Sequence, residues 1–126
     1  MGAVLAIGVG NAAADRHAES SATKVRSKVT ISGIQGNAVT GRVTARKRVC
    51  EKSRLVSLLR LSGGEAVEVD LEASDAAGSF VVEDEPLLSG TTYLVGVGKV
   101  TIKDIRPERK PKKTICKQSE SKQFVP

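Results

Sequence analysis

The sequence predicts an all-β protein, an antiparallel β-sandwich of seven to eight short strands that is held by one disulfide. Three observations indicate this class. Apolar residues recur at every second position, as they do in half-buried strands. Turns that contain glycine separate the apolar runs, and no amphipathic helix of useful length interrupts them. The chain has no Trp, one Tyr and two Phe among its 126 residues, so aliphatic and β-branched side chains, which favour strands, must fill the core.

The first two expected strands alternate apolar and polar side chains. In the first, polar residues flank Val29 and Ile31, and in the second the non-polar positions are Val39, Gly41 and Val43. Successive side chains of a strand point to opposite faces, so each run would turn one face to a core and the other to water. We therefore expect two half-buried strands here.

Two further strands are expected over residues 55–61 and 66–72, joined by a tight hairpin at Gly63-Gly64. The first carries aliphatic side chains on both faces, which predicts a central place in a sheet. The second alternates strictly: its apolar positions are Val67, Val69 and Leu71, and its acidic positions are Glu68, Asp70 and Glu72. We expect the apolar side chains to be half-buried and the acids to face water.

The later strands follow recognisable turns. The Asp75 side chain can accept hydrogen bonds from amides just downstream, and Gly78 can adopt a positive φ without steric cost. Phe80 would then enter the core, and Tyr93 would bury its ring while its hydroxyl stays at a polar edge. The remaining strand-like runs are residues 100–102, 115–116 and 124–125.

The two cysteines, Cys50 and Cys116, are expected to form the disulfide. They lack the close spacing of zinc or redox sites, and no histidine lies near either one. An exported chain with an even number of cysteines usually pairs them. Both are expected in strand-like segments, and two buried free thiols are the alternative.

The chain is expected to divide into three segments. Residues 1–14 resemble the end of a secretory signal peptide, because a short apolar run leads to the A-x-A-like cleavage site Ala12-Ala13-Ala14. No Lys or Arg precedes that run, so the usual basic start is missing, and the run is too short to span a bilayer. Residues 15–25 are expected to be a flexible leader, and residues 26–126 the sandwich domain.

The net charge of +6 is unevenly distributed along the chain. Between Glu65 and Glu85 there are eight acids and no Lys or Arg, so the rest of the chain carries a formal +14. A nucleic-acid-binding protein usually clusters its positive charge without an equal acidic block. The pattern therefore indicates a bipolar molecule, and no sequence-specific nucleic-acid binding is expected.

Catalysis and metal binding are not expected. The only histidine is His17, in the expected leader, so a Ser-His-Asp arrangement is disfavoured. Glu83, Asp84 and Glu85 are adjacent, but a solvated acidic loop is the simpler interpretation. Calcium held by this acidic block is the alternative, although the EF-hand spacing is absent. We predict no enzyme activity, no cofactor and no resident metal.

Two basic clusters are candidates for anion binding. The first consists of Arg46, Lys47 and Arg48, and the second of Arg106, Arg109, Lys110, Lys112 and Lys113. Pro107 and Pro111 would stiffen the second cluster, and a disulfide would tie the two clusters together. Such a patch would suit acidic surface polymers, anionic lipid headgroups or phosphates. The alternative is that these charges only deter edge-to-edge aggregation.

Four short motifs carry a resemblance to a known group of domains. They are Gly41-Arg42-Val43, Arg54-Leu55-Val56-Ser57-Leu58, Asp75-x-x-Gly78-Ser79-Phe80 and Gly90-x-x-Tyr93. In this order they resemble the prealbumin-like sandwich domains, which include the carboxypeptidase regulatory-like (transthyretin-like) modules. Cys50 ahead of Arg54 and the closing stretch from Cys116 also resemble small exported bacterial modules of uncharacterised function.

The resemblance covers residues 28–125 and implies an immunoglobulin-like or transthyretin-like sandwich without catalytic residues. Two features depart from the group. Ser89-Gly90, with an extra Thr ahead of Tyr93, replaces the usual Pro-Gly, and residues 24–35 have no counterpart and would add an edge strand.

These observations lead to an expected function and location. We expect a non-catalytic structural or adhesive module of the cell envelope or secreted space, which places it outside the cell or on its surface. The alternative is an anion-binding module that uses residues 106–113. The expected partners are acidic surface polymers or a neighbouring domain, and no membrane span is expected.

Overall fold

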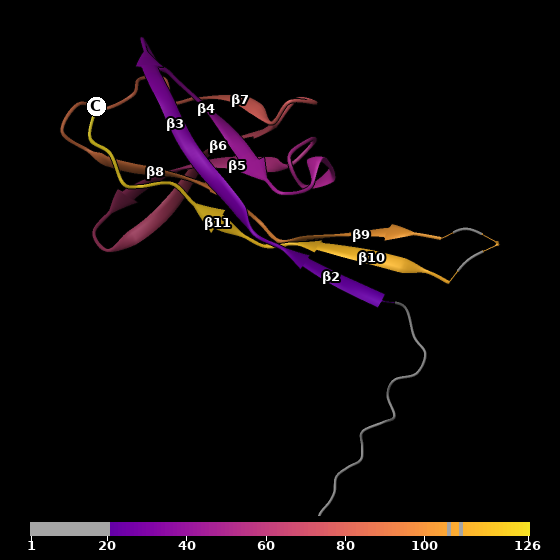
Figure 1. Cartoon of the computed structure of the whole chain (residues 1–126). Helices are drawn as coiled ribbons and strands as arrows, with labels where there is room; N and C mark the ends of the chain where they lie inside the picture. The colour runs from indigo at the N-terminus through magenta and orange to yellow at the C-terminus, as the bar shows by residue number, and fades with distance from the viewer. Residues whose placement is uncertain (1–20, 106, 109) are drawn as a thin grey trace, which may run out of the picture. The chain divides into compact units, whose positions relative to one another are not determined.

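The computed structural model describes residues 21–105, 107–108 and 110–126, which form an almost entirely β-structure (Figure 1). The expected signal-peptide remnant (1–14), the first part of the expected leader (15–20), Arg106 and Arg109 lie outside the described residues. The elements in chain order are β2 (Ser21–Val25), β3 (Ser27–Gln35), β4 (Ala38–Ala45), the 3-10 turn η1 (Arg48–Cys50), β5 (Leu55–Ser62), β6 (Glu65–Ala73), β7 (Ser79–Glu83), β8 (Thr92–Val97), β9 (Val100–Asp104), β10 (Lys112–Cys116) and β11 (Ser119–Glu120).

The all-β class predicted from the sequence is confirmed, with more strands than expected. The described residues contain ten strands where seven to eight were predicted. The two that the sequence did not reveal are β2, which occupies the last five residues of the expected flexible leader, and β11, which is two residues long. Regular structure is therefore present from Ser21 among the described residues, ahead of the expected boundary at residue 26.

The chain forms two compact units. The larger unit consists of Lys24–Val100 and Cys116–Pro126, and the smaller unit takes Thr101–Ile115 together with the residues up to Thr23. Strands β2, β10 and β9 form a three-stranded sheet in that order.

The larger unit is sandwich-like, because two sheets contribute to one core. One sheet has the order β11-β8-β5-β6 and the other the order β3-β4-β7, and all the neighbouring strands that they pair are antiparallel. Their buried side chains form a single cluster made of Val29, Val39, Val43, Val56, Leu58, Phe80, Val82, Tyr93, Val95 and Val97. The composition predicted a core of aliphatic side chains, and valine is the commonest residue in it, with Phe80 as one of its few large members.

Strand β5 is central, as its sequence predicted, since it pairs with β6 on one side and β8 on the other. Val56 and Leu58 are fully buried, whereas Leu55 on the opposite face is 60% exposed. The hairpin to β6 turns at Gly63 and Gly64, whose φ angles of 60° and 84° explain why glycine occupies both positions.

The turn before β7 also has the expected form. The Asp75 carboxylate accepts hydrogen bonds from the amides of Ala77 and Ser79, each at 2.9 Å. Gly78 adopts a φ of 86°, and Phe80, only 3% exposed, then enters the core. This turn positions β7 against β4.

The expectation for β6 was wrong in one respect. Glu68 and Glu72 are exposed as predicted, but Leu71 is 45% exposed and Val67 is 41% exposed. The pairing between β5 and β6 shifts between Leu58 and Leu59. Such a bulge moves the following residues to the other face of the sheet.

The register after the bulge places Asp70 opposite the buried Leu58, and Leu71 opposite Ser57. Directly paired residues share a face, so Asp70 lies on the core side of β6 while Leu71 points outward. The Asp70 carboxylate accepts a hydrogen bond from the amide of Glu83 in β7 at 2.7 Å. One acid that was expected to face water thus connects the two sheets at their edge.

Tyr93 behaves as its amphipathic side chain predicts. Tyr93 is fully buried, and its hydroxyl donates a hydrogen bond to Asp84 at 2.9 Å and accepts one from the Leu88 amide at 2.8 Å. Phe124, near the end of the chain, pairs with Tyr93 through the backbone and stacks on its ring at a centroid distance of 5.8 Å. The chain end therefore closes over the core.

No helix in the described part of the chain has the length and apolar character needed to cross a bilayer.

Candidate functional site

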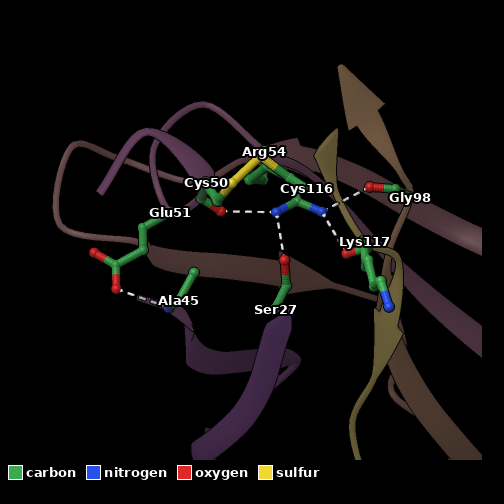
Figure 2. The surroundings of a disulfide bond; sticks show 8 residues. All are labelled: Ser27, Ala45, Cys50, Glu51, Arg54, Gly98, Cys116 and Lys117. Carbon is green, nitrogen blue, oxygen red and sulfur yellow. Dashed lines mark hydrogen bonds between the residues drawn. A yellow bond between two sulfur atoms is a disulfide. The ribbon is translucent and has the colours of Figure 1, made fainter. Parts of the chain in front are cut away.

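The predicted disulfide between Cys50 and Cys116 is present in the larger unit (Figure 2). The two Cα atoms are 5.4 Å apart, and both cysteines are fully buried. Cys116 ends strand β10, as expected, but Cys50 lies in the 3-10 turn η1 rather than in a strand. The bridge therefore joins a tight turn after β4 to the last strand residue before β11.

A buried arginine lies beside this bridge. Arg54, which immediately precedes β5, is only 2% exposed, and its guanidinium points toward the disulfide segments in Figure 2. One terminal nitrogen donates to the Ser27 hydroxyl at 2.8 Å and to the Cys50 carbonyl at 2.7 Å. The other donates to the carbonyls of Gly98 at 2.7 Å and Lys117 at 3.2 Å.

The partners of Arg54 come from four separate places in the larger unit. They are the start of β3, the turn η1, the link between β8 and β9, and the link between β10 and β11. Within the described part of the chain, the hydrogen bonds of this guanidinium go to neutral oxygen atoms. Burial lowers the pKa of Arg54 from its ordinary value, because desolvation disfavours the charged form.

A second buried polar residue, Ser74, bonds to the segment between the bridge and β5. Its hydroxyl accepts from the Arg54 amide at 2.9 Å and donates to the Glu51 carbonyl at 2.6 Å. Its own amide donates to the Arg54 carbonyl at 2.8 Å. Buried polar groups are costly unless they are hydrogen-bonded, so these bonds hold residues 50–54 in one conformation.

The first basic cluster follows β4 and runs into η1: Arg46 and Lys47 form the link, and Arg48 begins the turn. All three residues are exposed. Glu51, just beyond the cluster, turns its carboxylate back to accept from the Ala45 amide at 2.9 Å. The cluster is therefore presented on a turn that is anchored both by Glu51 and by the disulfide.

The second basic cluster belongs to the smaller unit. Lys110 and Lys112 are exposed and Lys113 is half-buried, at the start of β10. A hollow of about 220 Å³ lies beside them, lined by Lys103, Ile105, Pro111, Lys112 and Lys113. Arg106 and Arg109 lie outside the described residues. The predicted union of the two basic clusters in one patch stays a prediction, because the clusters belong to different units.

The acidic residues gather at the edge formed by β6 and β7. An open cleft there is lined by Val69, Asp70, Glu72, Val81, Glu83, Asp84 and Glu85. The Asp84 carboxylate has two side-chain partners: it forms an ion pair with Arg60 at 3.2 Å and accepts a hydrogen bond from the Tyr93 hydroxyl. Among residues 21–105, 107–108 and 110–126, no group of three or more His, Cys, Asp or Glu side chains is arranged to hold a metal ion.

Comparison with protein-family models, with curated proteins and with solved structures finds no match to this chain.

The sequence located the cysteines and both basic clusters, but it missed the arginine that organises the site. Arg54 begins one of the four motifs that carry the family resemblance, but the motif assigned it no role, and by itself it resembles any charged residue ahead of a strand. The one local feature that bears on its role is its position four residues after Cys50, whose carbonyl accepts one of its hydrogen bonds. The other partners lie 27, 44 and 63 residues away, so no local pattern reveals them.

Proposed function

We propose that the chain is a non-catalytic structural or adhesive module that works in the cell envelope or the secreted space. The observation that carries this proposal is the fully buried bridge between Cys50 and Cys116. Structural disulfides persist in oxidising compartments and are rare in the reducing cytosol. The surrounding polar groups serve the fold: the Arg54 guanidinium donates to three backbone carbonyls and to the Ser27 hydroxyl, and the Ser74 hydroxyl bonds a backbone amide and a backbone carbonyl.

We also propose that the sandwich belongs to the prealbumin-like group, with the transthyretin-like modules as its nearest type. Three motif residues support this proposal by their roles. Gly78 makes the turn, Phe80 enters the core, and Tyr93 is buried with its hydroxyl bonded at the edge. Modules of this kind act through their surfaces, which agrees with a structural or adhesive role.

Export is the part of the proposal that a reporter can test. The whole chain, fused ahead of a reporter enzyme that becomes active only after it forms disulfides, should give active reporter outside the bacterial cytosol. A matched fusion that lacks residues 1–14 should give little activity. Equal and low activity from both fusions would contradict export of this chain.

A second candidate function is anion binding by the smaller unit. The observation that favours it is the exposure of Lys110 and Lys112 beside the hollow that Lys103 and Lys113 also line. Clustered ammonium groups attract polyanions, and releasing bound counterions makes such binding sensitive to salt. Acidic surface polymers are the proposed ligands.

Retention on a heparin column tests this second candidate. Changing Lys110, Lys112 and Lys113 together to Gln should lower the salt concentration that elutes the protein. A matched variant that changes Lys28, Lys52 and Lys122, three exposed lysines of the larger unit, removes the same charge elsewhere. If both variants elute at the same salt concentration, retention depends only on the total charge of the protein. The proposal of a binding site on the smaller unit would then be wrong.

The first basic cluster needs its own variant, because the predicted patch includes it. If both clusters contact the same polymer, changing Arg46, Lys47 and Arg48 to Gln should weaken retention beyond the loss caused by the three lysine changes in the smaller unit. Retention that falls only in this variant would move the proposed anion site to the larger unit.

A further inference from the structure

We propose that Arg54 is the positioning residue for the Cys50–Cys116 pair: it keeps the two cysteines adjacent when they are reduced, so that the disulfide re-forms inside the folded larger unit. The guanidinium binds one hydroxyl and three carbonyl oxygens, and no sulfur atom takes part. The acceptors belong to Ser27, Cys50, Gly98 and Lys117. All four therefore remain available when the bond between the sulfurs is broken.

The acceptors lie on both sides of the bridge. One is the carbonyl of Cys50 itself, and another is the carbonyl of Lys117, the residue after Cys116. A single planar group thus holds the backbone next to each sulfur, as Figure 2 shows. The disulfide and the guanidinium are two independent connections between the same two segments.

The burial of Arg54 makes its connection hard to release. At 2% exposure the charged group has little access to water, so the protein oxygens must replace its hydration. Moving either cysteine segment away would take one of its four acceptors from this buried charge, which is unfavourable. In the reduced protein the segments are therefore expected to stay where the guanidinium holds them.

The reaction that re-forms the bond is thiol–disulfide exchange with a small disulfide such as oxidised glutathione, which reaches the fully buried cysteines only when the chain opens locally. The thiolate of one cysteine attacks a glutathione sulfur, forms a mixed disulfide and releases one glutathione thiolate. The second cysteine thiolate then attacks the protein sulfur of the mixed disulfide and releases the second glutathione. The glutathione S–S bond breaks, the protein S–S bond forms, and the two protons from the protein thiols pass to the two glutathione thiolates.

The quantity that tests the proposal is the effective concentration of the two thiols in the folded protein, measured by equilibration of the full chain with reduced and oxidised glutathione. Arg54→Gln should lower this value at least about tenfold, because well-oriented groups owe their high effective concentrations to being held in place. The reduction potential should rise by about 30 mV for each tenfold loss. Arg54→Lys, which keeps a charge and some donors, should give an intermediate value.

Arg60→Gln is the matched control, because Arg60 lies in the strand that follows Arg54 and bonds only Asp84 among the contacts described above. The Arg60→Gln variant should lose the bond to Asp84 equally in the oxidised and reduced forms. The effective concentration of its two cysteine thiols should therefore equal that of the unchanged protein. Ser27→Ala, which removes one acceptor, should shift the value in the same direction as Arg54→Lys and by less.

Two results would overturn the proposal. In the first, the effective concentration of the two thiols in Arg54→Lys lies within about twofold of the value in the unchanged protein, and the free energy of unfolding of this variant falls equally in both redox forms. Arg54 would then stabilise the fold without positioning the cysteines. The second is a reduced, unchanged chain that circular dichroism shows to be unfolded. If Arg54→Gln does not fold when reduced, Arg54→Lys and Ser27→Ala decide. Neither result depends on export or on anion binding.

Discussion

At the scale of single residues, a glycine fixes how closely β4 packs against its neighbours. Gly41 pairs with Ile31 of β3 on one side and with Phe80 of β7 on the other. A Cβ atom at this position would collide with the Thr30 carbonyl oxygen and would lie 2.6 Å from Cζ of Phe80. The carbonyl belongs to a strand backbone and the ring is buried, so neither neighbour can move aside easily.

Gly41→Ala should therefore lower the free energy of unfolding by about 3 kcal/mol, toward the upper end of the usual cost of overpacking a core. Chemical denaturation measures this loss. Gly33→Ala is the control, since a Cβ there would meet only the Thr40 hydroxyl at an ordinary 3.6 Å; it should cost less than about 1 kcal/mol. Equal losses in the two variants would show that space around Gly41 is not the constraint.

Local chemistry decides which residue roles can be predicted from the sequence. The Asp75–Gly78 turn and the buried ring of Tyr93 were predicted correctly, because the first depends on nearby amides and the second on the side chain's own amphipathic nature. The role of Arg54 depends on acceptors far away along the chain, and a charged side chain gives no sign of burial by itself. The candidate site was therefore predicted in its cysteines and missed in its organising residue.

At the scale of elements, the alternation of apolar and polar residues locates strands better than it locates their faces. The alternation in β6 correctly predicted a strand, but the bulge opposite Leu58 and Leu59 reversed the faces of Asp70 and Leu71. A one-residue slip is invisible in the sequence because both strands keep their own period of two. Position within the sheet also matters: β6 is an edge strand, so its apolar face is only partly covered.

Short polar elements are the other class that the sequence did not reveal. Strand β2 reads SATKV, with only two clearly apolar side chains, and β11 has two residues that pair with Val97 and Gly96 of β8. Backbone hydrogen bonds to neighbouring strands form these elements, and side-chain pattern contributes little. The tight turn η1 is similar, since its identity comes from backbone bonds such as the Glu51 amide to the Arg48 carbonyl at 2.8 Å.

At the scale of the whole molecule, the disulfide constrains where the chain leaves and re-enters the larger unit. The chain leaves that unit after Val100 and returns at Cys116, which the bridge ties to Cys50. The cysteines are 66 positions apart in the sequence. Cross-linking a loop of this length removes conformational freedom from the unfolded chain, worth roughly 4 kcal/mol in the chain-entropy model.

A core with few aromatic side chains depends strongly on that contribution, because domains of ordinary stability unfold at a cost of only about 5–15 kcal/mol. Reducing the disulfide with a phosphine should therefore lower the melting temperature by roughly 15–30 °C, since each kcal/mol moves a small domain by roughly 4–8 °C. Differential scanning calorimetry with and without the reductant measures the shift. A Cys50→Ala, Cys116→Ala variant is the control, and the same reductant should leave its melting temperature unchanged. A reduced protein that melts within about 3 °C of the oxidised one would mean that packing and the Arg54 hydrogen bonds alone hold the larger unit, and that the bridge adds little to the thermal stability of the fold.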